Sequence, residues 1–471
     1  MKKQQSSLNK WASLRHALST GGGAPDCFLA GPETTITQSD FVLGSALFDR
    51  GVELSGRCVL VATTSQLIAA SALIELDGLA RRIVVCPPDI SLEHLPYVMD
   101  TAAVDVIVSD RAMHNFGGKR PLIFSPCSRT IVPRVISGSS RHKTEWILLT
   151  SGTTGAPKLV VHTLESLAGA IVKPAEQPGK PVVWSTFYDV RRYGGLQILL
   201  RAVLTGASLV LSDAREPIQT FLARAAAHGV THISGTPSHW RRVLMSSCAQ
   251  LIEPEYIRLS GEIADQAILN SLRAVYPHAR IVHAFASTEA GVAFEVTDGL
   301  AGFPTSIVEQ SKSVEMKVED GSLRIRSNRN ASCYLGQGAP QLKASDGFID
   351  SGDMLELRNG RYYFSGRRDG VINIGGLKVH PEEIESVINR HPAVWASLVR
   401  TKKNPITGAL VVADVVLQHG SQNPKRNRRE MQDDILMLCR ESLSSYKIPA
   451  AINFISDLSV SESGKVLRRN A

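Results

Sequence analysis

Short apolar runs alternate with helical stretches over most of the first 365 residues of this 471-residue chain. The strand-like runs are 59–62, 83–86, 104–108, 182–185, 208–211 and 281–284. Apolar runs of this length separated by helices are typical of βαβ units, because a parallel strand is buried on both faces and needs a crossover to reach the next strand. The pattern therefore predicts layered α/β structure with largely parallel sheets.

The pattern changes near Ser313. From there apolar and polar residues alternate around Glu319-Asp-Gly321 and Asn359-Gly360, which predict the turns of β-hairpins. After Gly366-Arg-Arg-Asp-Gly370 come a short strand, a helix opening at Pro381, two apolar runs and a second helix. We expect a large N-terminal domain, residues 1–366, that ends in a small β subdomain, and a small mobile α+β domain, residues 367–471, with a hinge at 366–370.

Composition is that of an ordinary globular protein, with 43% hydrophobic and 20% charged residues. No window approaches the roughly 18 to 20 apolar residues of a membrane span. The residues after Lys3 are polar, so we expect no signal peptide and predict a cytoplasmic location. The seven cysteines are scattered singly, without zinc spacing, and are expected to be reduced thiols.

The net charge of +8 is concentrated toward the C-terminus, where 16 Lys and Arg face 11 Asp and Glu from Arg367 onward. This surplus would suit a docking face for an anionic partner. Its densest part, 425–429, is better interpreted as a solvated loop that opens a helix. No repeat or aromatic interleaving supports a nucleic-acid platform, so no nucleic-acid partner is expected.

Hydroxyls, glycines and a lysine crowd the segment after the apolar run 146–149. Glycines let the backbone approach an anion closely, and hydroxyls can donate to its oxygens. The residues concerned are Thr150, Ser151, Gly152, Thr153, Thr154, Gly155 and Lys158. The spacing is not that of a Walker loop, because Ala156 and Pro157 separate glycine from lysine. A flexible linker would not follow a buried strand, so the segment predicts a phosphate-binding loop.

A second motif, Phe285-Ala-Ser-Thr-Glu-Ala-Gly291, follows the run 281–284. Ligands of open α/β sheets bind at the carboxyl ends of the strands. Glu289 is a suitable carboxylate for Mg²⁺, Thr288 can bond a phosphate oxygen, and Phe285 can stack on a base. Taken alone, Ser-Thr-Glu also fits a helix N-cap with an acidic first turn.

Three further residues have chemistry suited to a nucleotide. Asp353, in Asp350-Ser-Gly-Asp353, can grip two ribose hydroxyls, although an Asx-type turn explains it equally well. Arg367 can contact a ribose or an α-phosphate. Lys465, in Ser461-Glu-Ser-Gly-Lys465, would by itself be an ordinary exposed lysine.

Together, in order and approximate spacing, these motifs resemble those of the adenylate-forming superfamily, which includes acyl-CoA synthetases, stand-alone adenylation enzymes and luciferases. The resemblance runs from about Gly44 to the C-terminus. It implies an ATP-binding, AMP-forming acid–thiol ligase that uses Mg²⁺. The residues that it assigns are Lys465, Glu289 and Thr288 for catalysis, Glu289 for the metal, and Phe285, Asp353 and Arg367 for the nucleotide beside the loop 150–158.

The same resemblance implies domain movement between two half-reactions. Asp369 would be the hinge, and the segment with Gly375, Gly376 and Lys378 would reach the thiol tunnel. The chain departs from the family where Phe285-Ala286 replaces Tyr-Gly, where Leu159 replaces glycine and where Ser351 replaces threonine. None of these changes removes a group that the chemistry needs, so activity is expected.

The implied reaction activates a carboxylic acid to acyl-AMP, releases pyrophosphate and transfers the acyl group to the phosphopantetheine thiol of CoA. A stand-alone enzyme that loads an acyl or aryl carrier protein is the alternative, and a non-catalytic nucleotide-binding protein is a remote one. The predicted acyl pocket includes Tyr188, Arg191, Tyr193, Gly261 and Ala286. Ala286 favours a short or flat acid, so an aryl or small functionalised acid is expected, and Arg191 would pair with the substrate only if it points inward. The sequence does not specify an oligomeric state.

Overall fold

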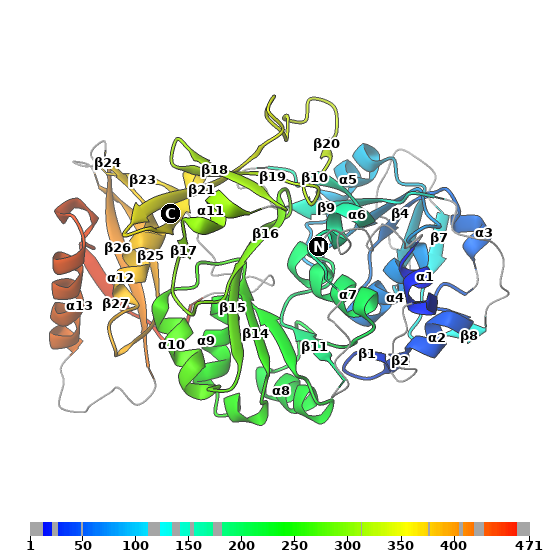
Figure 1. The fold of residues 1–471 in the computed structure, drawn as a ribbon, viewed down its shortest axis with the longest axis horizontal. Helices are drawn as coiled ribbons and strands as arrows, with labels where there is room; N and C mark the ends of the chain where they lie inside the picture. The colour runs from blue at the N-terminus through cyan, green and yellow to red at the C-terminus, as the bar shows by residue number, and fades with distance from the viewer. Residues whose placement is uncertain are drawn as a thin grey trace.

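The computed structural model describes residues 13–20, 27–48, 50–111, 123–133, 142–150, 155–172, 181–311, 313–374, 377–404, 408–418 and 428–458. Two large sheets with helices, a five-stranded antiparallel sheet and a small α+β domain make up the molecule (Figure 1). The small domain lies at one end, at the left of Figure 1, and the seven-stranded one of the two large sheets lies at the other.

The first large sheet has seven strands in the order β20-β10-β9-β5-β4-β6-β7. These are β4 (Cys58–Val61), β5 (Arg82–Val85), β6 (Val106–Ser109), β7 (Ile123–Pro126), β9 (Glu145–Thr150), β10 (Lys158–Thr163) and β20 (Cys333–Leu335). Strands β9, β5, β4, β6 and β7 are parallel, and β10 and β20 add antiparallel strands at one edge. The inner strand β4 is buried along its whole length, as its continuous apolar run predicts.

The second large sheet has eight strands in the order β16-β15-β14-β13-β11-β12-β1-β2. These are β1 (Phe28–Ala30), β2 (Thr35–Thr37), β11 (Val183–Thr186), β12 (Ser208–Leu211), β13 (His232–Gly235), β14 (Tyr256–Ser260), β15 (Arg280–Ser287) and β16 (Gly291–Val296). Its six inner strands are parallel, and β2 and β16 are antiparallel edges. The prediction of largely parallel sheets is confirmed.

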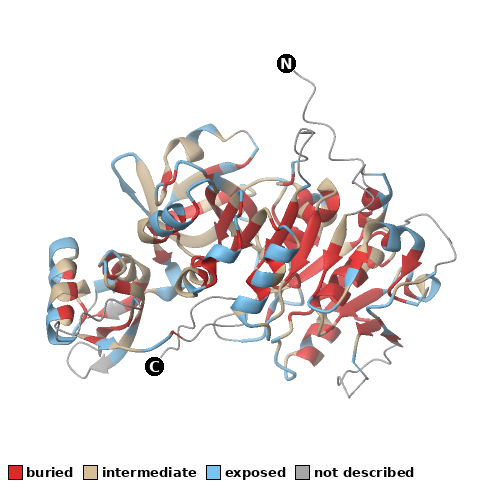
Figure 2. Cartoon of the chain, turned by 90° about the horizontal axis from the view of Figure 1, so that it is seen from below, coloured by how far each residue is buried: buried red, intermediate tan, exposed pale blue. Residues whose placement is uncertain are grey.

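The two large sheets share one hydrophobic core, to which helices α4 and α7 contribute. Buried residues fill the strands of the larger part of the molecule (Figure 2). Every residue of α4 except Glu75 is buried. A helix that is apolar on all sides needs such a place between two layers. The helices of this domain are α1 (Leu14–Thr20), α2 (Gln38–Leu43), α3 (Gly51–Leu54), α4 (Gln66–Leu76), α5 (Leu95–Ala102), α6 (Leu164–Ala168), α7 (Tyr193–Thr205), α8 (Ile218–Ala227), α9 (Pro237–Met245), α10 (Gln266–Val275) and α11 (Ser306–Gln310). Strands β3 (Gly44–Ser45) and β8 (Val132–Pro133) form a small separate ladder.

The β subdomain is an antiparallel sheet in the order β17-β22-β21-β19-β18. Its strands are β17 (Phe303–Pro304), β18 (Glu315–Glu319), β19 (Ser322–Arg326), β21 (Ile349–Arg358) and β22 (Arg361–Arg367). Asp320-Gly321 and Asn359-Gly360 close two hairpins, and all four residues have positive φ. Both predicted turns are confirmed, because two-residue hairpin loops favour this conformation and Asn, Asp and Gly adopt it at low cost.

In the described residues of the C-terminal part there are a two-stranded sheet, β23-β24, a three-stranded sheet, β25-β26-β27, and two α-helices. Its elements are β23 (Ile372–Ile374), β24 (Leu377–Val379), α12 (Pro381–Ile388), β25 (Val394–Asn404), β26 (Gly408–Leu417), α13 (Arg428–Ser442) and β27 (Ala451–Phe454). They enclose a core of their own, in which Ile384, Val415 and Ile435 are fully buried. The predicted boundary at 366–370 stays a prediction, and a short 3₁₀ turn spans Arg368–Gly370.

A hydrogen bond joins this C-terminal part to helix α10, which packs beside the second large sheet. Asn389, just after α12, donates to the carboxylate of Asp265 at 3.3 Å. Asp265 caps α10 and forms an ion pair with Arg241. None of the helices in the described part of the chain combines the length and the apolar character needed to cross a bilayer.

A buried carboxylate links the N-terminal helix to the first large sheet. Asp77 accepts hydrogen bonds from the backbone N–H of Leu14 at 2.8 Å and from Trp146 Nε1 at 3.0 Å. Burial raises the pKa of Asp77 to about 6, although both hydrogen bonds favour the charged form. Ionised Asp77 therefore costs stability that the protonated form does not.

Asp77→Asn tests this cost through pH. The folded pKa lies above the unfolded value near 3.8, so wild-type stability contributed by this group is present below pH about 3.8 and is lost as the pH rises through about 6. The melting temperature of the variant minus that of wild type should therefore rise between pH 4 and pH 6 and then level off. The whole rise should correspond to about 2 to 3 kcal/mol in the free energy of unfolding. Asp320→Asn, at a side chain that is 84% exposed, is the control. A difference that does not depend on pH would contradict the prediction.

Candidate active site

The predicted phosphate loop connects two antiparallel strands. Thr150 is the last residue of β9 and Lys158 is the first of β10, and the two pair directly across the ladder. Ser151, Gly152, Thr153 and Thr154 lie outside the described residues. Gly155 is exposed, and, apart from its chain neighbours, no atom of the described residues lies within 4 Å of the position that a Cβ would take. The loop is therefore a hairpin connection, which separates it from a Walker loop on structural grounds as well.

Tyr334 brings the end of this loop to the Ser-Thr-Glu motif. The Lys158 Nζ lies 5.2 Å from the centre of the Tyr334 ring, and the Tyr334 hydroxyl donates to Glu289 Oε1 at 3.2 Å. Burial and the charge of Glu289 raise the pKa of Tyr334, which keeps its hydroxyl protonated as a donor. A cation, a ring and a carboxylate from three separate segments thus meet at one place.

The Ser-Thr-Glu motif lies at a turn between strands. β15 extends to Ser287, and Thr288 to Ala290 lead into the antiparallel strand β16. The alternative reading of the motif as a helix N-cap is wrong, because β16 takes the place that a helix would have. Phe285 lies inside β15, where its ring stacks against Phe294 at 5.8 Å and Phe364 at 5.1 Å. Its role in base stacking stays a prediction.

Asp353 and Arg367 face each other across the β21–β22 ladder. They are register partners, with Arg367 Nη1 3.9 Å from Asp353 Oδ1. The side chain of Arg367 is 56% exposed, whereas that of Asp353 is 18% exposed. Asp353 lies inside a strand and not in a turn ahead of one, and Gly352 before it has φ of 70°. The structure therefore brings the two predicted nucleotide contacts together.

The residues assigned to domain movement and the thiol tunnel are placed only in part. Asp369 lies in the exposed 3₁₀ turn and Lys378 is exposed on β24. Gly375, Gly376 and Lys465 lie outside the described residues. Their roles, and the position of Lys465 relative to the residues above, stay predictions.

Arg191 is buried and salt-bridged. Its guanidinium forms two hydrogen bonds with Asp189, Nε to Oδ1 at 2.8 Å and Nη2 to Oδ2 at 2.5 Å, and its Nη1 donates to the carbonyl oxygens of Thr63 and Thr64. These partners within the protein occupy four of the five N–H donors of Arg191. The sequence left open whether Arg191 points toward the substrate or forms a salt bridge, and these contacts favour the salt bridge. Its place in the acyl pocket stays a prediction.

The other predicted acyl-pocket residues lie at the carboxyl edge of the second large sheet and at the start of α7. Tyr188 is buried, with its hydroxyl donating to the Ser260 carbonyl at 2.5 Å, and Tyr193 is the first residue of α7. Gly261 follows β14 and is exposed, with φ of 84°. Ala286 is half-buried against the core that joins the two sheets.

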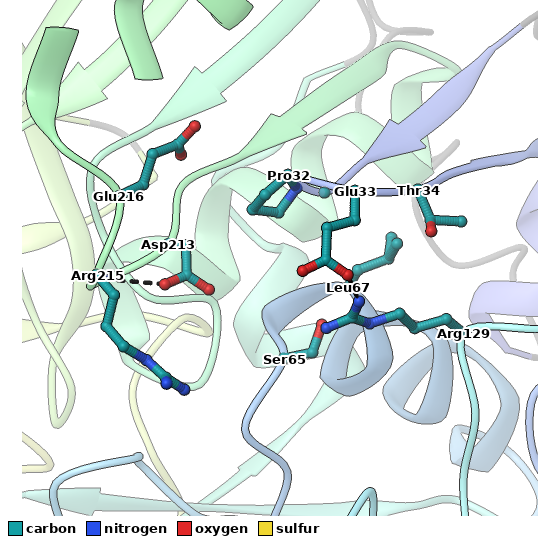
Figure 3. A pocket seen from close by; sticks show the side chains of 10 residues that line it. Pro32, Glu33, Thr34, Ser65, Leu67, Arg129, Asp213, Arg215 and Glu216 are labelled. Carbon is teal, nitrogen blue, oxygen red and sulfur yellow. Dashed lines mark hydrogen bonds and ion pairs between the residues drawn. The ribbon is translucent and has the colours of Figure 1, made fainter. Parts of the chain in front are cut away.

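A hollow of about 410 Å³ lies elsewhere, between the β1–β2 turn, the start of α4 and the segment after β12 (Figure 3). It is lined by Gly31, Pro32, Glu33, Thr34, Ser65, Leu67, Arg129, Asp213, Arg215 and Glu216. Glu33 forms an ion pair with Arg129, and Glu216 with Arg224. None of the described residues of the motifs discussed above lines it, so it does not contribute to the candidate site as described.

The donor set around Glu289 fits Mg²⁺. Mg²⁺ is usually held by one or two carboxylates, waters and substrate phosphates. Glu289 supplies one carboxylate, and Lys158, at one end of the phosphate loop, reaches the same place through Tyr334. Within the described residues no group of three or more His, Cys, Asp or Glu side chains lies together as a metal site.

Two residues near the candidate site were not predicted. Tyr334, in the short run Cys-Tyr-Leu, carries no local signal, because its contacts come from β10 and from the turn after β15. His162 did carry a signal, since it is a polar residue that ends the apolar run 159–161. Its imidazole is fully buried and lies 2.6 Å from the Thr288 carbonyl oxygen.

The sequence model of the AMP-binding enzyme family matches residues 80–335 of the chain, and that of the AMP-binding enzyme C-terminal domain matches residues 383–465. The first match alone covers more than half of the sequence. The chain belongs to the AMP-binding enzyme family. This confirms the predicted superfamily and the prediction that the chain is an enzyme.

Curated relatives of this AMP-binding enzyme include named CoA ligases. The chain is 25% identical over 389 residues to the mitochondrial acyl-coenzyme A synthetase ACSM5 of Mus musculus, covering 77% of the chain and 66% of the relative. It is 28% identical over 312 residues to the 2-succinylbenzoate–CoA ligase of Salmonella typhimurium, covering 64% of each. The chain therefore spans less than two thirds of the length of these relatives.

Solved structures share the fold over nearly the whole chain. The anthranilate CoA ligase AuaEII in complex with anthranoyl-AMP superposes with a TM-score of 0.78 at 17% identity, covering 96% of this AMP-binding enzyme and 95% of that chain. A variant of E. coli MenE with bound OSB-AMS superposes with a TM-score of 0.76 at 18% identity, covering 95% and 96%. The predicted fold class, a large layered α/β domain followed by a small α+β domain, is confirmed.

Proposed function

We propose that this AMP-binding enzyme activates a carboxylic acid with ATP and transfers the acyl group to the thiol of CoA. The observation that carries the proposal is the meeting of Lys158, Tyr334 and Glu289 in a chain whose family binds AMP. The pairing of Asp353 with Arg367 supports it, because a carboxylate beside a guanidinium suits a ribose and its phosphate.

In the first half-reaction, a substrate carboxylate oxygen attacks the α-phosphorus of ATP. The bond from that phosphorus to the oxygen between the α and β phosphates breaks, and this oxygen leaves with the pyrophosphate. The loop from Thr150 to Lys158 would hold the departing phosphates, and Asp353 and Arg367 would hold the ribose side. Mg²⁺ bound at Glu289 would supply positive charge to the phosphates. Positioning and charge are what such a transfer needs from a protein, so no covalent nucleophile is required.

In the second half-reaction, a thiol that has lost its proton attacks the acyl carbon, and the bond to the AMP oxygen breaks. By the family resemblance, Lys465 serves the first half-reaction, and the segment with Gly375, Gly376 and Lys378 serves the second after rotation at Asp369. Such rotation would also have to break the contact between Asn389 and Asp265. Loss of this hydrogen bond would therefore accompany the proposed rotation.

We propose an aryl or small functionalised acid as the substrate. Two of the proteins named above are ligases of 2-succinylbenzoate and of anthranilate, and both of these acids contain an aromatic ring. Ala286 supports a flat substrate, because its methyl group narrows a position where the family usually has glycine. The salt bridge of Arg191 to Asp189 removes one candidate partner for a second polar group on the substrate.

A screen of carboxylic acids by pyrophosphate release, followed by a comparison of thiol acceptors, tests the proposal. We expect release with aryl or small acids in the presence of Mg²⁺ and ATP, and thioester formation with CoA at low concentration. If the acyl group is transferred only to a holo carrier protein and not to CoA, the enzyme is a carrier-loading enzyme and not a CoA ligase. ATP binding without pyrophosphate exchange for any acid would indicate a non-catalytic nucleotide-binding protein.

A further inference from the structure

His162 lies on the strand that leaves the phosphate loop. β10 begins at Lys158, and His162 is four residues further along, so the two side chains leave the strand on the same face. Tyr334 pairs with Val160, the residue between them on that face. Lys158, Val160 and His162 therefore lie in this order along one face of β10, and Tyr334 of β20 lies beside Val160.

The imidazole is held in one tautomer. Its Nε2 lies 2.6 Å from the backbone oxygen of Thr288, and its Nδ1 lies 2.9 Å from Ser166 Oγ. A carbonyl oxygen can only accept, so the proton is on Nε2, and Nδ1 is left as an acceptor that faces Ser166 Oγ. The Ser166 hydroxyl also lies within donating distance of the Thr163 carbonyl, at 3.0 Å. The ring is fully buried, and burial lowers the pKa of His162 to about 4, which keeps it neutral.

The partner of His162 belongs to the turn that carries the proposed metal ligand. The Glu289 carbonyl accepts from the backbone N–H of Ala331 at 2.8 Å, and the Ala290 N–H donates to Ser287 Oγ at 3.0 Å. The carbonyl of Thr288 is instead held by the side chain of His162. This hydrogen bond ties the turn to the strand that leaves the phosphate loop.

We propose that His162 is a positioning residue, which sets the Thr288–Glu289 turn relative to the phosphate loop through the Thr288 carbonyl. The inference rests on the proposed binding of Mg²⁺ and ATP at this place. Breaking the link lets the turn shift by rotation of its backbone, so Glu289 and the loop no longer meet the same nucleotide in the best geometry. A residue that orients a metal ligand in this way is commonly worth about 10- to 100-fold in affinity.

Two polar variants of His162 separate its two hydrogen bonds. Glutamine carries an amide near the position of Nε2 and can still donate to Thr288, whereas asparagine carries its amide near Nδ1 and keeps only the Ser166 side. We expect His162→Asn to weaken binding of ATP with Mg²⁺ by about 10-fold, and His162→Gln by less than about 3-fold. Calorimetric titration with ATP and Mg²⁺ measures this without any acid substrate.

Kinetics give a second readout. In His162→Asn the KM for ATP and the Mg²⁺ concentration for half-maximal pyrophosphate release should rise by a similar factor of about 10. Thioester formation from supplied acyl-AMP should fall by a smaller factor, because that step uses neither Mg²⁺ nor the β and γ phosphates. His232→Asn is the matched control. This half-buried histidine pairs with Tyr256 at the amino end of the second large sheet, whereas Thr288 lies beyond the carboxyl end of β15 in that sheet.

The outcomes are distinct from those that test the proposed function. Equal binding by both His162 variants, whether like wild type or equally weakened, would overturn the positioning role, because the link to Thr288 would then make no difference. If His162→Asn does not fold, normal affinity and KM in a folded His162→Ala variant would overturn it too, and about 10-fold losses would support it. A wild-type protein that neither binds ATP with Mg²⁺ nor releases pyrophosphate would instead refute the proposed function.

Discussion

Lys465→Ala is expected to abolish ATP-dependent acyl-AMP formation while sparing thioester formation from supplied acyl-AMP. The lysine would contribute positive charge where charge develops between the carboxylate and the α-phosphate. Removing such a preorganised group costs at least about 100-fold in rate. The two half-reactions are measured separately, by pyrophosphate release with acid and ATP, and by CoA thioester formation from synthetic acyl-AMP.

The control for this experiment is Lys402→Ala, which removes an exposed lysine from β25 of the same C-terminal part. It should change neither half-reaction by more than about 2-fold, because a solvated charge at the surface contributes little. Equal loss of both half-reactions in Lys465→Ala would reject the assigned role. Lys465 lies outside the described residues, so this prediction depends on the sequence alone.

Asp189→Ala should destabilise the N-terminal domain by about 3 to 5 kcal/mol. The substitution leaves the guanidinium of Arg191 buried with its charge uncompensated, since the pair is 3% and 8% exposed. The remaining acceptors, the carbonyls of Thr63 and Thr64, carry no formal charge. Chemical denaturation followed by the fluorescence of the buried Trp146 and Trp184 measures the loss.

A second ion pair with the same spacing provides the control. Glu356 and Arg358 are also two residues apart, but their side chains are 48% and 47% exposed. Glu356→Ala should cost no more than about 1 kcal/mol. The double variant Asp189→Ala/Arg191→Ala should lose less than the sum of the two single losses, because no charge then stays buried alone. Equal small losses at both pairs would show that the buried pair contributes no more than the exposed one.

Elements with strong local patterns could be predicted from the sequence. The run 208–211 coincides with β12, and both hairpin turns of the β subdomain are where Asp320-Gly321 and Asn359-Gly360 place them. Burial of a strand on both faces demands apolar residues at every position, and these turns demand residues that tolerate positive φ. Both requirements are local, so they can be recognised one segment at a time.

The ends of strands and their pairing partners were harder to predict from the sequence. β15 extends three residues past the predicted run, to Ser287, because β16 returns alongside it and provides hydrogen-bonding partners. Asp353 was expected in a turn and lies within β21, because β22 pairs with it there. In each case the deciding partner is another strand, and an isolated segment does not contain that information.

The sequence by itself determined the family and the kinds of groups that the candidate site contains, because the motifs depend on residue type and spacing. Only the tertiary structure decided that Lys158 meets Glu289 through Tyr334, that Arg191 is bound by Asp189, and that His162 holds the turn at Thr288. These contacts join segments that are distant in the chain. Strand order and register bring them together, and both result from packing the whole core rather than from any one segment.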